Sequence, residues 1–165
     1  MTETFLTKLF EHNHWANLRI IAACSALTDE QLDAAPQAGS SWSIRHTLTH
    51  IVEAQRGYLS LLTLPPEARR AAPLAFAELR ESAARSGEGL LALARDETRR
   101  TFEPRLRTTD GYLVEPWVVM VQIINHASEH RRQICGMLRA IGAPAPDLDG
   151  WTFAESVGAL VRIAK

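Results

Sequence analysis

The sequence has few of the residues that mark a secreted, membrane-spanning or nucleic-acid-binding protein. Its two cysteines, Cys24 and Cys135, form no CxxC pair, so we expect neither a disulfide scaffold nor a cysteine zinc site. No apolar run approaches the roughly 20 residues that a membrane helix needs, and the N-terminus lacks the apolar core of a signal peptide. The net charge of -1 gives no electrostatic reason to bind nucleic acid. We expect a soluble cytoplasmic protein whose partners are small molecules or proteins, with no nucleic acid and no membrane.

Four long amphipathic segments predict an all-α fold. Apolar residues recur at helical spacing over residues 3–26, 44–62, 74–97 and 117–141. A length of 165 residues and a hydrophobic content of 46% suit one compact domain. We therefore predict a four-helix bundle that occupies residues 1–165 as a single domain.

Short extra elements are predicted between and after these helices. A capping box that starts at Thr28 opens a short helical turn, and a second one that starts at Thr152 opens a short C-terminal helix. An Asp-Gly pair between short extended stretches predicts a small hairpin within residues 101–115.

The segment 117–141 is sharply bounded and carries a pair of histidines. Pro116 suits the first helical position, and Gly142 followed by a proline is a stop signal. His126 and His130 lie one turn apart, so both imidazoles point the same way and can bind one metal ion. The face centred on His126, which we expect to point into the protein, contains Val119, Gln122, Ile123, His130, Gln133, Ile134, Met137, Ala140 and Ile141.

A second HxxxH pair, His46 and His50, lies on the helix at 44–62, which either Ser41 or Ser43 can cap. Six histidines placed at random would give roughly 0.2 such pairs, and the chain has two. In a bundle the two helices can face each other, so that ligands from both converge on one ion. Histidines with hydrogen bonds inside the core are the alternative interpretation of both pairs.

Three histidines with an open fourth position form a typical catalytic zinc-type site. His126 and His130 would supply two ligands, and one histidine of the helix at 44–62 the third. We prefer His50, because its face leaves room for a metal and a substrate, whereas His46 lies nearer the exposed start of the helix. The sequence therefore predicts one bound divalent metal ion.

The other polar residues near these histidines receive structural interpretations. Arg131 and Arg132 could hold a substrate carboxylate, but both lie toward the outer flank of their helix and are predicted to be solvated or interface charges. His12 could support the site, although a hydrogen-bonded core histidine is the preferred interpretation. Glu53 could orient a ligand, and a surface acid is preferred. Glu129 points about 100° away from His130 and is left out.

The first helix has a predicted inner face from which His14 is absent. That face contains Phe5, Leu9, His12, Ala16 and Ile20. In the third helix, Gly87 and Gly89 lower the helix propensity and predict a bend or close packing. The two cysteines are predicted to pack as small apolar residues.

Three motifs resemble the DinB family of four-helix-bundle metalloproteins, which is related to the YfiT-like group. They are HNHWAN in the first helix, WSIRHTLTHIVEA in the second and INHASEHRRQICGMLRAIGAPAPDLD in the last, so the resemblance spans most of the chain. In that family, a histidine that ends the LxH run of the second helix and an HxxxH on the last main helix bind a divalent metal, most often zinc or nickel. The resemblance assigns these roles to His50, His126 and His130.

The resemblance also implies a function. Better-studied relatives include metal-dependent transferases and isomerases that use low-molecular-weight thiols. We therefore expect a metal-dependent transferase that activates such a thiol, with a non-catalytic metal- or small-molecule-binding protein of the stress response as the alternative. A ferritin-like di-iron protein is disfavoured, because only Glu11 and His14 have the E-x-x-H spacing that such proteins require twice.

Two positions depart from the family pattern. The family often has H-R-G-Q after the last ligand, and here Arg132 stands in the glycine place between Arg131 and Gln133. Gln122 stands where some members carry another histidine. We expect metal binding to survive both changes, and substrate contacts to differ.

The back of the last helix predicts a homodimer. Its first turns carry an outward apolar patch made of Trp117, Val118, Met120, Val121 and Ile124. Within the chain, only the short C-terminal helix could cover this patch. Two-fold pairing of such patches is the commonest solution among oligomers, so a dimer is preferred over intramolecular cover.

Overall fold

A computed structural model describes residues 4–34, 42–70, 72–96, 104–161 and 163. Within these residues the chain forms a bundle of four helices of 17 to 25 residues, which confirms the predicted all-α fold. The four are α1 (Phe5–Cys24), α3 (Ile44–Thr63), α4 (Leu79–Arg95) and α5 (Pro116–Ala140). Their bounds agree with the predicted segments to within a few residues, except that α4 starts five residues late, after a 3-10 turn.

Short elements connect and follow the four helices. They are α2 (Asp29–Asp33), the 3-10 turns η1 (Pro66–Ala68) and η2 (Phe76–Glu78), the strands β1 (Leu106–Arg107) and β2 (Leu113–Val114), and α6 (Gly150–Ser156). The two strands pair antiparallel, with Leu106 opposite Val114, which confirms the predicted hairpin. Residues 101–103, where the hairpin prediction began, lie outside the described residues.

Side-chain caps set where four of the described helices begin, and the first is Thr4 at the start of α1. Thr28 and Gln31 form the predicted capping box of α2. The Ser43 hydroxyl accepts from the His46 amide and caps α3, whereas Ser41 and its loop lie outside the described residues. The predicted box at Thr152 is wrong: α6 starts earlier, because the Asp149 carboxylate accepts from the Thr152 amide at 2.8 Å.

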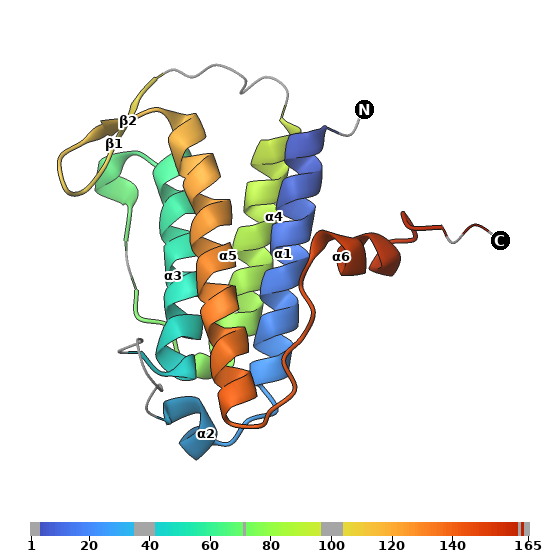
Figure 1. Cartoon of the computed structure of the whole chain (residues 1–165). Coiled ribbons are helices and arrows are strands. Elements are labelled where there is room, and N and C mark those ends of the chain that lie inside the picture. Colours follow the sequence, from blue (N-terminus) through green and yellow to red (C-terminus); the bar gives the residue numbers. More distant parts are fainter. Residues whose placement is uncertain (1–3, 35–41, 71, 97–103, 162, 164–165) are drawn as a thin grey trace.

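The packing of the helices decides which faces meet. α1 and α3 each pack against both α4 and α5, while α6 lies beside α1 and the hairpin beside α3 (Figure 1). The packing of α3 against α5 thus brings the two histidine-bearing helices together. In the described part of the chain, no helix has the length and apolar character needed to cross a membrane.

The core consists of two apolar clusters with a polar layer between them. One cluster surrounds Ile20, Leu48 and Ile134, and the other surrounds Phe10 and Leu90. The buried polar side chains between them are Asn13, Asn17, Gln55, Ser86 and Arg131. Asn17 donates to Gln55 at 2.8 Å and Gln55 donates to Ser86 at 2.7 Å, so hydrogen bonds join α1, α3 and α4 across the core. These bonds satisfy groups that would otherwise be costly to bury.

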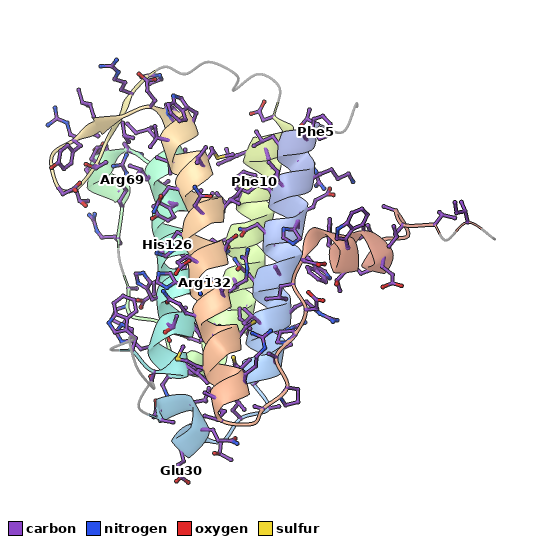
Figure 2. All side chains as sticks on the ribbon, viewed as in Figure 1. Phe5, Phe10, Glu30, Arg69, His126 and Arg132 are labelled. Atoms are coloured by element: carbon purple, nitrogen blue, oxygen red, sulfur yellow. The ribbon has the colours of Figure 1, made fainter. Side chains whose placement is uncertain are left out.

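The inner face of α1 differs from the predicted one. Phe5 is 92% exposed at the outer end of the helix, and Leu9 is half exposed (Figure 2). The buried face keeps Ala16 and Ile20, as predicted, and otherwise runs through Phe10, Asn13 and Asn17. The prediction followed the apolar residues alone, whereas the two asparagines are buried because they belong to the polar layer. Polar side chains with partners in the fold cannot be told from solvated ones by their spacing.

His14 also points into the bundle, contrary to the prediction, and packs against Gly87 of α4. A Cβ atom on Gly87 would lie 2.0 Å from Nδ1 of His14, which is far inside any permitted contact. Nδ1 itself is buried without a hydrogen-bond partner, and burial lowers the pKa of His14, so the ring is neutral. The predicted close packing at Gly87 is confirmed, and it lets α1 and α4 approach at this level.

Candidate metal centre

His50, His126 and His130 lie together between α3 and α5, as predicted. Nε2 of His50 lies 2.9 Å from Nε2 of His126, and one ligand atom of each of the three residues falls within 4.8 Å of the others. Figure 2 shows His126 on the side of α5 that faces α3. All three rings are half-buried. Three imidazoles from two helices therefore converge without a loop having to hold any of them.

The dimensions of the trio suit a single metal ion. Tetrahedral coordination with metal–nitrogen distances of about 2.1 Å places pairs of ligand nitrogens about 3.4 Å apart. The observed 2.9 Å contact and the 4.8 Å limit bracket that value. Two facing nitrogens at 2.9 Å share one proton, and a metal would replace that proton after a small adjustment of the side chains. The donor set is all nitrogen and carries no charge, which suits zinc, nickel and similar ions.

The electrostatics of the site keep the imidazoles of His50 and His126 neutral, which is the form that binds metal. Burial lowers the pKa of His126 to about 4, and repulsion from His130 and His50 adds to the shift. Burial also lowers the pKa of His50, again with a contribution from His130. Both rings are therefore unprotonated near neutral pH, so metal binding does not have to displace a positive charge.

The sequence predicted that His126 lies at the centre of the buried face of α5. In the structure His126 and His130 lie at the border of that face. The residues of α5 that are buried are Val119, Ile123, Ala127, Arg131, Ile134, Cys135 and Leu138. Their centre lies at Ala127, about 100° around the helix from His126. Gln122, which was predicted on the inner face, is exposed. This offset puts the trio at the margin of the core, where an open coordination position can be reached from solvent.

Gln133 orients one of the three rings. Nδ1 of His130 donates to Oε1 of Gln133 at 2.9 Å, and Nε2 of Gln133 donates to the Glu129 carboxylate at 3.2 Å. Glu129 also accepts from Arg132 at 2.7 Å. Because Glu129 can only accept, the amide of Gln133 must turn its oxygen to His130, which leaves Nε2 of that ring bare for a metal. The sequence analysis assigned no role to Gln133, although its i,i+3 spacing from His130 allows this contact.

Replacing Gln133 with leucine is expected to weaken metal binding about 10- to 100-fold, because His130 then loses the partner that fixes its tautomer and ring orientation. Gln133→Glu, which can still accept from Nδ1, should keep most of the affinity. Competition with a chromophoric chelator measures both dissociation constants. Equal affinities for wild type and the leucine variant would contradict the positioning role.

Two further aromatic side chains border the trio. The Trp42 ring lies 4.5 Å from His46, 4.9 Å from His50 and 5.9 Å from His130, measured between ring centroids. The Tyr58 ring lies 5.9 Å from His126, edge to face. Trp42 was missed at the sequence level, where the only signal was its place just before the helix cap. His46 is exposed on the first turn of α3 and outside the trio, as predicted.

Arg131 occupies a different place from the predicted outer flank. Its side chain is only 4% exposed, and its guanidinium donates to Asn13 at 2.7 Å, to Asn17, and to Ser128 at 3.0 Å. Burial lowers the pKa of Arg131 to about 10, so it stays charged. The physical reason is that the asparagine oxygens of α1 supply acceptors inside the bundle. Arg131 thus joins α5 to the polar layer and cannot reach a substrate.

The remaining polar residues follow their structural interpretations. Arg132 is an exposed partner of Glu129, and Glu53 is an exposed acid. His12 donates from Nε2 to the Leu148 carbonyl at 2.8 Å, which confirms a hydrogen-bonded histidine. Both cysteines are buried free thiols, as predicted, and burial raises the pKa of Cys24 to about 12.

Comparison with known proteins agrees with this arrangement. The family model described as the DinB family matches residues 1–159, which is nearly the whole chain. A search of curated proteins finds none that matches. With a helical bundle, a histidine trio at the positions of the family motifs and a match over this length, the chain belongs to the DinB family.

Proposed function

We propose that His50, His126 and His130 bind one divalent metal ion, zinc or nickel, and that the ion serves a transferase acting on a low-molecular-weight thiol. The observation that carries the proposal is the convergence of three half-buried imidazoles, of which burial keeps His50 and His126 neutral. Three protein ligands leave one position of a tetrahedral ion open, which is the arrangement of catalytic zinc sites and not of structural ones.

The neutral ligand set determines what the open position prefers. Because the imidazoles carry no charge, a bound divalent ion keeps its full charge and lowers the pKa of a thiol held there. The thiol proton would be lost to solvent, and the sulfur could then form a bond to an electrophilic carbon while the leaving group departs with its electron pair.

Chelation is expected to abolish thiol consumption while the protein stays folded. The two apolar clusters supply a core that does not depend on the ion, so the far-ultraviolet circular dichroism should change little. A screen pairs thiols with electrophiles and measures free thiol before and after treatment with a chelator. Bound metal without any metal-dependent consumption would favour the non-catalytic alternative, and unfolding of the apo protein would make the metal structural.

We further propose that the chain forms a homodimer through the back of α5. Trp117, Val118 and Val121 are 50%, 37% and 49% exposed, and α6, the cover considered from the sequence, lies beside α1 (Figure 1). Exposed neighbouring apolar side chains on one helix are unusual on a monomer surface.

Val121→Glu is expected to convert a dimer to a monomer, because the charge would be buried unpaired at the two-fold contact. Val121 is preferred over Ile124, which packs partly against the core and whose replacement would also destabilise the fold. Sedimentation velocity at micromolar concentration measures the mass of both proteins. A monomeric wild type rules out the dimer.

A further inference from the structure

Trp42 is the largest side chain that borders the histidine trio. Its ring centroid lies 4.9 Å from that of His50, with the rings at 67°, and 5.9 Å from that of His130, with the rings at 22°. Two of the three proposed ligands are thus in contact with the indole. Trp42 is nevertheless 36% exposed, so it presents apolar surface beside the trio. A substituent on any molecule anchored at the trio comes within reach of this ring.

The arginines that lie near the trio in the sequence have hydrogen-bond partners of their own. The four arginines within six positions of a trio histidine on α3 and α5 all have hydrogen-bond acceptors of their own. Arg45 donates to Asp29 and Asp33, Arg56 to the Ala72 carbonyl, Arg131 to Asn13 and Asn17, and Arg132 to Glu129.

The remaining charge on this part of α3 is negative, since Glu53 is exposed three residues after His50. Glu53 would therefore repel a carboxylate on the substrate, and each of these four guanidinium groups already donates to another acceptor. Recognition beyond the metal anchor falls to the aromatic rings.

We propose that Trp42 determines substrate specificity at the trio, by stacking on a flat apolar substituent of the thiol and so favouring aromatic thiols over small or anionic ones. This inference rests on the proposed function, because the metal holds the sulfur. Offset or edge-to-face contact between aromatic rings contributes an amount of binding that corresponds to about tenfold in affinity.

The test uses the full chain loaded with cobalt(II), whose absorption changes when sulfur binds. Three probe thiols are titrated: phenylmethanethiol, ethanethiol and 3-mercaptopropionate. The ratio of the dissociation constants of ethanethiol and phenylmethanethiol is compared between wild type, Trp42→Ala and the matched control Trp151→Ala. Trp151 is 72% exposed on α6, which packs beside α1, so its loss removes an indole without touching the site between α3 and α5.

The preference for phenylmethanethiol over ethanethiol should fall about tenfold in Trp42→Ala and stay unchanged in Trp151→Ala. The anionic 3-mercaptopropionate should bind wild type no more tightly than ethanethiol. If Trp42→Ala fails to bind cobalt, Trp42→Leu takes its place. Leucine keeps apolar bulk without a ring, so this variant should also lose the preference for phenylmethanethiol. A wild type that binds cobalt and thiols without this preference, or a leucine variant that keeps it in full, overturns the role of Trp42. A wild type that binds no cobalt overturns the proposed function and this inference with it.

Discussion

Replacing any one of His50, His126 or His130 with alanine is expected to reduce the bound metal from close to one ion per chain to less than about one tenth, because two imidazoles hold a divalent ion far more weakly than three. All three ligand nitrogens lie within 4.8 Å of one another, so the loss should be equally severe at each position. Protein purified without a nickel column and dialysed against trace metal allows the ion to be counted by mass spectrometry.

His46→Ala is the matched control for this series. His46 is an exposed histidine on the same helix as His50, one turn away, and lies outside the trio. Its replacement should leave the metal content unchanged. A loss at His46 as large as at His50 would show that the ion is held differently from the proposal.

Gly87→Ala is expected to destabilise the protein by about 2 kcal/mol, although the same change in an exposed helix position stabilises. The added methyl group would lie 2.0 Å from Nδ1 and 3.0 Å from Cγ of His14, so the imidazole would have to leave the interface between α1 and α4. Urea denaturation gives the change in the free energy of unfolding.

Gly136→Ala is the matched control, since Gly136 also lies inside a long helix but its new methyl group would meet nothing within 4 Å. It should stabilise by about 0.5 to 1 kcal/mol. His14→Ala combined with Gly87→Ala should recover most of the loss, because the clash partner is gone. A Gly87→Ala protein as stable as wild type would mean that the ring moves aside at no cost.

The sequence was informative about the fold where a local signal decides the outcome. Helical periodicity located the four long helices, and Pro116 correctly marked the start of α5. The capping box at Thr28 correctly marked the start of α2, because it too is a local signal. The start of α6 was misplaced, because Asp149 and Thr152 are both good N-caps and the spacing alone does not choose between them.

The candidate site was predictable in its ligands and not in its surroundings. His126 and His130 are neighbours on one helix, so their juxtaposition follows from helix geometry alone. His50 required the bundle, or the resemblance to the DinB family, to bring it near them. Trp42 and Gln133 gave no comparable signal. Trp42 precedes α3, so its contact with the His50 ring depends on the tertiary fold, and the orientation of the Gln133 amide depends on its partners in space.

The sequence by itself determined the helices, the histidine pairs and the family, because these depend on the order and spacing of residues along the chain. Only the tertiary structure decided which faces are buried. Arg131, Asn13 and His14 show the reason: a polar side chain is buried when the fold supplies its partner or an opposite glycine, and neither can be read from its own helix. The same packing places His126 at the margin of the core and not at its predicted centre, so that a bound ion would be open to a substrate.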